Sequence, residues 1–203
     1  QLGRMVPRKG VDTAIVALGH VRATELDARL VVVGGANREP DPARDPELAR
    51  LMQVADDAGV RDAVIFTGSR SRDRLKLYYA AADIFVTAPW YEPFGITPLE
   101  AMACARPVIA SDVGGLRYTV ADCETGLRVP PRDPRALGAA MVELLANPAR
   151  AEAMGAAGLE RVRERLDAAF EAPPGCDVRR LDHHGVRAAD RRAKAGGGEP
   201  DHV

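Results

Sequence analysis

Five short apolar runs, separated by longer segments of helical periodicity, constrain the fold of this chain more than any other feature. Four runs are clear, at Arg29–Val33, Ala63–Thr67, Ile84–Thr87 and Pro107–Ala110, and a weaker one is at Gly126–Val129. Such alternation is typical of βαβ units on a parallel sheet. The first three runs are continuously apolar, which predicts strands covered on both faces. We therefore expect an α/β fold with a doubly wound parallel sheet.

Helical spacing fills the segments between these runs. We expect helices over residues 11–23, 46–58, 73–82, 98–105, 134–146 and 148–166. Asp45-Pro46 and Thr97-Pro98 each place a capping residue before a proline at the first helical position. The first four residues, Gln1 to Arg4, are predicted to be the trailing edge of a further strand, because a parallel fold needs a strand before its first helix.

The final stretch of the chain differs in composition from the rest. After residue 166 the apolar residues are few and have no period of 2 or 3.6, and the stretch includes Pro173-Pro174-Gly175 and three consecutive glycines at 196–198. Segments of this kind do not bury enough apolar surface to fold. We expect a folded domain over residues 1–166 and a disordered tail over 167–203.

Composition excludes several classes of function. The 28 Lys and Arg residues nearly balance the 29 Asp and Glu residues, which argues against a nucleic-acid partner. No apolar run approaches the ~18 residues of a transmembrane segment, and the first ten residues lack the apolar core of a signal peptide, so we expect a cytosolic protein. The three cysteines form no CxxC pair, and only one histidine precedes the last 21 residues, so no metal site is predicted.

The loops that follow the strands carry the candidate chemistry, because ligands of doubly wound folds bind at the carboxyl ends of the strands. The loop after the first, truncated strand contains the basic pair Arg4 and Lys9. The helix that begins at the Thr97-Pro98 pair offers free N–H groups and a positive dipole end, which suit a phosphate, and Gly95 lets a ligand approach the backbone closely. We expect Glu100 on the first turn of this helix and Glu92 in the loop before it, where both could accept sugar hydroxyls. Gly34-Gly35 lacks a GxGxxG pattern and is interpreted as a tight turn, which disfavours a nicotinamide enzyme.

One segment resembles a known family. Glu92 and Glu100, with seven residues between them in EPFGITPLEAMACARPVIASDVGG, are similar to the donor-site motif of retaining glycosyltransferases of the GT-B fold. Arg4 and Lys9 resemble the basic pair of the same family, and the similarity extends from about residue 3 to residue 166. The resemblance implies a Rossmann-like sheet that forms the C-terminal half of a GT-B fold.

The resemblance also implies roles for individual residues. Arg4 and Lys9 would neutralise the diphosphate of a nucleoside-diphosphate sugar, and Glu92 would face the transferred sugar. Phe94 would also face the sugar, and Glu100 would bind the ribose hydroxyls. The diphosphate would rest on the backbone amides of Gly95, Ile96 and Thr97. Arg70, in a loop that varies within the family, would approach the base. No cofactor is implied beyond this donor substrate.

The implied activity is transfer of a hexosyl group from the nucleotide sugar to a hydroxyl acceptor. In this family the other wall of the cleft belongs to an N-terminal acceptor-binding domain, which this chain lacks. We therefore expect a fragment that alone is weakly active or inactive. The alternative is a noncatalytic nucleotide-sugar-binding module or an inactive remnant. A GT-B epimerase or phosphorylase is a third reading, which the EPFG segment with Thr97-Pro98 disfavours.

Two positions depart from the family pattern. Ala105 follows the donor-site helix and Cys123 lies in a turn, and both stand where the family usually has glycine. A residue that ends a helix in the left-handed conformation is not freely changed from glycine to alanine. We expect backbone strain at these two positions.

Overall fold

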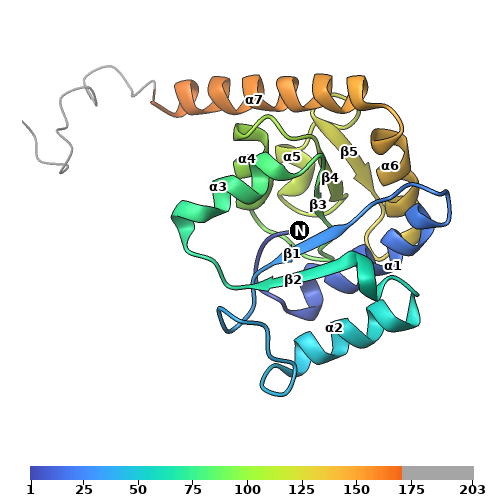
Figure 1. Ribbon diagram of the computed structural model, residues 1–203. Coiled ribbons are helices and arrows are strands. Elements are labelled where there is room, and N and C mark those ends of the chain that lie inside the picture. The colour runs from blue at the N-terminus through green and yellow to red at the C-terminus, as the bar shows by residue number, and fades with distance from the viewer. Residues whose placement is uncertain (171–203) are drawn as a thin grey trace, which may run out of the picture. The chain divides into compact units, whose positions relative to one another are not determined.

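Strands and helices alternate along the chain in the computed structural model, which describes residues 1–170 (Figure 1). The strands are β1 (Leu30–Val33), β2 (Val64–Gly68), β3 (Phe85–Thr87), β4 (Val108–Ser111) and β5 (Gly126–Val129). Each begins and ends within one residue of the apolar run that predicted it. The expected α/β architecture with parallel strands is confirmed.

The helices also follow the predicted order. They are α1 (Val11–Arg22), α2 (Pro46–Asp57), α3 (Arg72–Ala81), α4 (Ile96–Ala103), α5 (Leu116–Thr119), α6 (Pro134–Leu145) and α7 (Pro148–Phe170), with short 3-10 helices η1 (Pro7–Lys9) and η2 (Arg61–Ala63). The Asp45 side chain accepts hydrogen bonds from the first turn of α2, as expected of its cap. Helix α7 continues four residues past the boundary predicted at 166. The rest of the predicted tail, 171–203, lies outside the described residues.

The strands form two separate parallel sheets rather than the one that we expected. Strand β1 pairs with β2, and β4 lies between β3 and β5. The start of the chain is the trailing edge of a strand, as predicted, since Leu2 forms a parallel bridge with Val33 of β1. No ladder joins β1 to β3 among residues 1–170, and Leu2 contributes a single bridge to β1.

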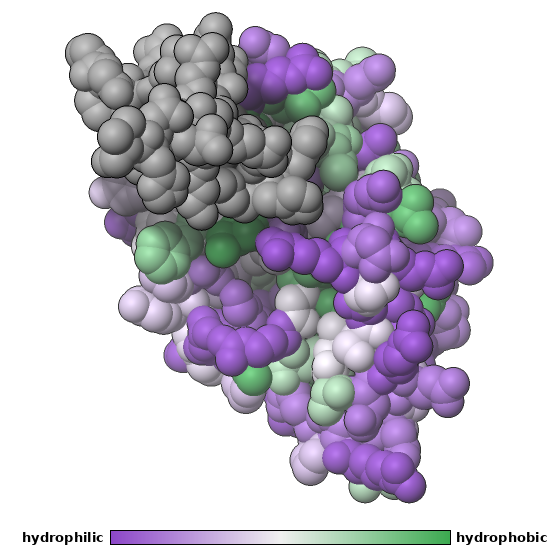
Figure 2. Space-filling view, turned by 90° about the vertical axis from the view of Figure 1, so that its left-hand side faces the viewer, coloured by the Kyte–Doolittle hydropathy of each residue, from purple (hydrophilic) through white to green (hydrophobic). Residues whose placement is uncertain are grey.

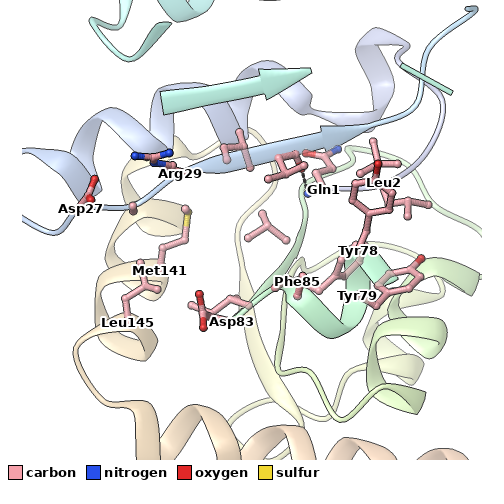
Figure 3. Close-up of a pocket in the computed structure, with 18 residues that line it drawn as sticks. Gln1, Leu2, Asp27, Arg29, Tyr78, Tyr79, Asp83, Phe85, Met141 and Leu145 are labelled. Carbon is pink, nitrogen blue, oxygen red and sulfur yellow. Dashed lines mark hydrogen bonds between the residues drawn. The ribbon is translucent and has the colours of Figure 1, made fainter. Parts of the chain in front are cut away.

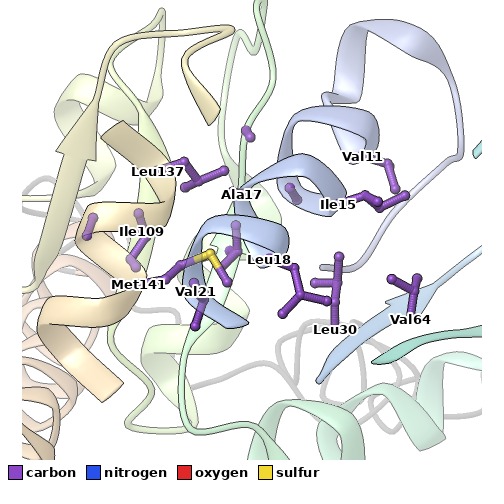
Figure 4. Close-up of a cluster of buried hydrophobic side chains, with 14 of the residues drawn as sticks. Val11, Ile15, Ala17, Leu18, Val21, Leu30, Val64, Ile109, Leu137 and Met141 are labelled. Atoms are coloured by element: carbon purple, nitrogen blue, oxygen red, sulfur yellow. The ribbon is translucent and has the colours of Figure 1, made fainter. Parts of the chain in front are cut away.

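Helices cover both sides of the strands. On one side α1 is buried along Val11, Ile15 and Leu18, and it packs against α6, as Figure 4 shows. On the other side a second apolar cluster joins Tyr79 of α3 and Met102 of α4 to residues of β3, β4 and α5. Burial of each large aliphatic side chain contributes roughly 1.5–3 kcal/mol. The two clusters hold the carboxyl ends of the strands at a common edge.

One strand is less covered than the sequence predicted. Ile65 of β2 is 43% exposed, although its run is continuously apolar. The prediction that this strand is covered on both faces was wrong, because the face of β2 that carries Ile65 is left partly open to solvent. The surface in Figure 2 is mainly hydrophilic, with apolar residues in small separate areas. Within residues 1–170, no helix has both the length and the apolar character needed to cross a bilayer.

Candidate functional site

Two loops that are distant in sequence meet at the carboxyl ends of the strands. The Trp90 N–H, in the loop after β3, donates to the Arg8 carbonyl of η1 over 3.1 Å, and an Arg8 guanidinium N–H donates to the Tyr91 carbonyl over 3.3 Å. Gly10 makes this approach feasible because a Cβ atom there would clash with the Ala88 carbonyl oxygen, and its φ of +63° favours glycine. The beginning of α1 is therefore fixed beside the end of β3.

This approach brings Lys9 to Glu92. The Lys9 Nζ lies 2.5 Å from the Glu92 Oε2, with the two side chains 21% and 14% exposed. The other carboxylate oxygen, Oε1, accepts from the N–H groups of Phe94 and Gly95 over 3.4 and 3.3 Å. Partial burial alone would raise the pKa of Glu92, but the Lys9 ammonium and these two N–H groups outweigh it and lower that pKa. The structure thus brings together two of the predicted site residues.

Helix α4 begins earlier than the sequence predicted. Gly95, with φ of +79°, is its N-cap, and Ile96 is its first residue, so Thr97 lies inside the helix and is not its cap. Pro98 is the third helical residue. Proline is tolerated there because backbone N–H groups in the first turn have no carbonyl partner within the helix. Glu100 is therefore on the second turn, whereas we expected the first. The N–H groups of Ile96 and Thr97 belong to the first turn and have no carbonyl partner within the helix.

Glu100 is held by a residue that sequence reasoning missed. The Tyr79 O–H donates to the Glu100 Oε2 over 2.7 Å. The Tyr79 ring is 3% exposed and packs against Phe85 with ring centroids 5.4 Å apart. Burial, with the hydrogen bond to Glu100, raises the pKa of the Tyr79 hydroxyl, which therefore remains a donor. One Glu100 oxygen is fixed in this way. No sequence signal linked Tyr79 to Glu100, since it resembles an ordinary core residue of α3.

The other predicted site residues have different surroundings. Arg4 is exposed and makes no side-chain hydrogen bond or ion pair with the residues that the structure describes. Arg70 donates to the carbonyls of Arg38 and Ser69 and to the Tyr78 hydroxyl, so its guanidinium braces the loop after β2. Phe94 and Ile96 are 74% and 62% exposed, which leaves two apolar side chains at the entrance to α4.

A second missed feature lies after β4. The Gly115 N–H donates to the Glu92 carbonyl over 2.9 Å, and a Cβ atom at Gly114 would clash with that same carbonyl. The loop at 112–115 therefore packs against the backbone of Glu92 and holds its carbonyl group in place. The VGG in the family-like segment was the available signal for this contact, although we assigned it no role. In residues 1–170, no group of three or more His, Cys, Asp or Glu side chains is arranged to hold a metal ion.

Comparison with known proteins shows the family of the chain. The sequence profile of the family described as Glycosyl transferases group 1 matches residues 1–161, which is most of the chain. The chain belongs to this family. Its fold is the Rossmann-like sheet of the C-terminal half of a GT-B glycosyltransferase, as predicted.

Among curated relatives, a GDP-mannose-dependent alpha-(1-6)-phosphatidylinositol monomannoside mannosyltransferase of Mycobacterium tuberculosis is 42% identical over 168 residues. The match covers 79% of this chain and 41% of the relative. The chain thus spans about two fifths of the length of the curated relatives that it matches.

Two solved structures are also similar. A sucrose-phosphate synthase from Thermosynechococcus elongatus has a TM-score of 0.71 at 36% identity, covering 83% of this chain and 44% of the synthase. The C-terminal domain of a group 1 glycosyl transferase, LpcC of Francisella tularensis, has a TM-score of 0.72 at 26% identity, covering 81% of this chain and 84% of that domain. The chain therefore corresponds in extent to one domain of a larger glycosyltransferase.

Proposed function

We propose that this chain binds the nucleoside-diphosphate sugar of a retaining glycosyltransferase that transfers a hexosyl group to a hydroxyl acceptor. One observation carries the proposal: the Glu92 carboxylate joins the Lys9 ammonium to the N–H group of Gly95, the N-cap of α4, while Glu100 lies on the second turn of the same helix and accepts a hydrogen bond from Tyr79. A cation, a helix N-terminus and a separate carboxylate match a diphosphate joined to a ribose.

The diphosphate would rest on the amides of Gly95, Ile96 and Thr97, with Lys9 and Arg4 as its cations. A diphosphate leaving group gains negative charge as the glycosidic bond breaks, so fixed donors stabilise the transition state more than the bound substrate. Each charge-assisted hydrogen bond is worth roughly 1.5–3 kcal/mol. Lys9 and the Gly95 amide both contact Glu92 in the structure, so the donor must compete with this carboxylate.

The rest of the donor would extend to either side of the diphosphate. The Glu100 oxygen that Tyr79 leaves free would accept the ribose hydroxyls, and Arg70 lies in the loop proposed to approach the base. Glu92, once released from Lys9, would face the transferred sugar together with the exposed Phe94 side chain. In these assignments, carboxylates of the protein accept hydrogen bonds from the hydroxyl groups of the sugar nucleotide. N–H groups of the protein donate hydrogen bonds to its phosphates.

Transfer itself would need a second domain. The curated relatives are more than twice as long as their match to this chain, which supports an N-terminal domain that binds the acceptor. In the complete enzyme the acceptor would attack on the face from which the diphosphate leaves, and the leaving phosphate would take the acceptor proton. The printed name of the Mycobacterium tuberculosis relative makes GDP-mannose the first donor to test.

Calorimetric titration with GDP, UDP and ADP tests the site. We expect Lys9→Met and Glu100→Gln each to weaken binding of the preferred nucleotide at least about tenfold, as the loss of one charge-assisted hydrogen bond predicts. Lys76→Met and Glu152→Gln make the same chemical changes at exposed positions of α3 and α7, and they should leave affinity unchanged. Equal affinity in all four variants would refute the assignment.

A chimera separates an enzyme half from a binding module. Residues 1–163 would replace the matching C-terminal part of the Mycobacterium tuberculosis mannosyltransferase, and transfer from radiolabelled GDP-mannose would be measured. Restored transfer supports the proposed function. Nucleotide binding without transfer by the folded chimera supports the noncatalytic module instead. Transfer by the 203-residue chain alone would contradict the expectation that a second domain is needed.

A further inference from the structure

An arginine and a tryptophan from two different loops are stacked at the carboxyl ends of the strands. The Arg132 guanidinium carbon lies 3.7 Å from the centroid of the Trp90 ring. A guanidinium over an aromatic face is attracted by the negative potential of the ring. The Arg132 side chain makes no hydrogen bond or ion pair within residues 1–170, so the stack is what orients it. The loop after β5 is thereby attached to the loop after β3.

The backbone at Arg132 is strained and is held on both sides. Its φ is +59°, a left-handed conformation that is unfavourable for a residue with a Cβ atom. Pro130 and Pro131 precede it, and Asp133 follows as the N-cap of α6, with its side chain bonded to the first turn of that helix. Glycine would fit this backbone with less strain but could not reach Trp90. A strained residue with a stacked side chain indicates a role for that side chain.

Trp90 lies in a loop that follows an anchored strand. Phe85, at the beginning of β3, packs against Tyr79 with ring centroids 5.4 Å apart, and both side chains are labelled in Figure 3. The strand ends at Thr87, and the Trp90 side chain beyond it is 39% exposed, so the apolar core does not enclose this ring. Arg132 therefore supplies a contact that restrains the position of the Trp90 ring.

The backbone of Trp90 is connected to the candidate site. Its N–H group donates to the Arg8 carbonyl over 3.1 Å, and Lys9 follows Arg8 in the chain. The Lys9 ammonium contacts the carboxylate of Glu92, which lies in the same loop as Trp90. Both partners of this ion pair thus adjoin the contact between Trp90 and Arg8. A displacement of Trp90 would move Lys9 relative to the beginning of α4.

We propose that Arg132 is a positioning residue of the donor site. Through its stack on Trp90 it holds Lys9 and the beginning of α4 in the arrangement that binds a diphosphate, without contacting the ligand itself. The proposal rests on the proposed function, because the affinity that it explains is that of the donor site. A site that is ordered before the ligand arrives binds more tightly, since less conformational freedom is lost on binding.

Three substitutions at Arg132 separate the cation from the backbone. Arg132→Lys keeps a cation and the strain, Arg132→Ala keeps only the strain, and Arg132→Gly removes both. We expect calorimetric affinity for the preferred nucleoside diphosphate to fall roughly twofold to fivefold in the Ala and Gly variants, and less in the Lys variant. Tm should be about 1–4 °C higher in the Gly variant than in the Ala variant. Affinity then follows the cation while stability follows the backbone, which a merely structural role would not produce.

Trp90 reports directly on the stack, because it is the only tryptophan among the 203 residues. Quenching of its fluorescence by acrylamide should increase in the Ala and Gly variants. Hydrogen exchange of the Trp90 and Gly95 amides should become at least about threefold faster in the same two variants. The matched control is Arg135→Ala, which removes an exposed arginine from the first turn of α6 and should change none of these readouts.

Other outcomes overturn the proposal. Equal losses of affinity in Arg132→Ala and Arg135→Ala would indicate a general effect of charge. A loss of affinity with unchanged quenching and exchange would show that Arg132 contacts the nucleotide directly. Recovery of full affinity in the Gly variant would show that the role is only structural. If the unsubstituted chain binds no nucleoside diphosphate, the proposed function fails, whereas unchanged quenching and exchange in the Arg132 variants would refute the positioning role without any nucleotide.

Discussion

The left-handed backbone at Ala105 allows the energetic cost of a non-glycine residue at the end of α4 to be measured. Ala105 follows α4 with φ of +54°, its N–H donates to the Met102 carbonyl, and the Arg106 N–H donates to the Ala101 carbonyl. These two bonds form a Schellman motif whose left-handed position normally holds glycine. The strain expected from the sequence is therefore present as a left-handed backbone, and Ala105→Gly should relieve it.

The magnitude follows from two opposing effects. A left-handed conformation costs a residue with a Cβ roughly 1–2 kcal/mol, whereas glycine makes the unfolded chain more flexible at a cost of roughly 0.4–1 kcal/mol. The net stabilisation by Ala105→Gly is about 0.5–1 kcal/mol. For a domain of this size it raises Tm by about 1–4 °C, measurable by calorimetry or thermal circular dichroism.

The matched control is the same substitution in a helix. Ala153 is exposed within α7, and Ala153→Gly should lower stability by about 1 kcal/mol, because glycine is unfavourable in a helix interior. The two variants therefore shift Tm in opposite directions. Cys123, with φ of +62° in an exposed turn, should respond to glycine as Ala105 does. The reasoning is refuted if Ala105→Gly lowers Tm as much as Ala153→Gly.

Three further predictions concern the site and the start of the chain. Glu92→Gln frees Lys9 from its carboxylate partner and should raise affinity for the preferred nucleoside diphosphate by about threefold to tenfold in calorimetry at low salt, with a smaller gain at high salt; an unchanged affinity would contradict it. Tyr79→Phe removes the hydrogen bond to Glu100 and should weaken binding of ribonucleotides more than that of 2′,3′-dideoxy analogues, whereas an equal loss for both would indicate a merely structural role. The Gln1 amine has a pKa of about 5 when folded and 8.0 when unfolded, so the unfolded chain binds more protons between these values, and Tm should rise from pH 5 to pH 8. Acetylation of Gln1 should flatten that rise, and a pH profile unaffected by acetylation would disprove the burial of this amine.

The strands were predictable because their signal is local. A continuous apolar run bounded by turn residues needs no knowledge of the rest of the chain, and each observed strand lies within one residue of its run. The cap at Asp45 was equally accessible, since its carboxylate bonds the next turn of its own helix. The family-like motif assigned Lys9 and Glu92, 83 residues apart, to one donor site, whereas the ion pair between them was not predicted.

The errors have a common physical cause. The Thr97-Pro98 pair had the composition of a helix start, but Gly95 in a left-handed conformation begins α4 two residues earlier. A local rule was outweighed by tertiary contacts, because Gly95 packs against Leu116 and Thr119 of α5, a helix that we did not predict. The contact between Tyr79 and Glu100 was inaccessible for the same reason, since it depends on how α3 and α4 pack.

The main-chain contacts that hold the loops of the site are largely separate from the charged side chains proposed to bind the ligand. Main-chain contacts, from Trp90 to Arg8 and from Gly115 to Glu92, hold the loops together without using the Lys9 ammonium or the Glu92 carboxylate. The ion pair itself is only partly buried, and such pairs contribute roughly 0–1 kcal/mol to stability. The Glu92 Oε1 atom also accepts from the Phe94 and Gly95 N–H groups, and glutamine keeps an oxygen there, so Lys9→Met and Glu92→Gln should leave the loop backbone in place. A change in nucleotide affinity in these variants can then be assigned to charge at the beginning of α4, because the same backbone presents the amides in every variant.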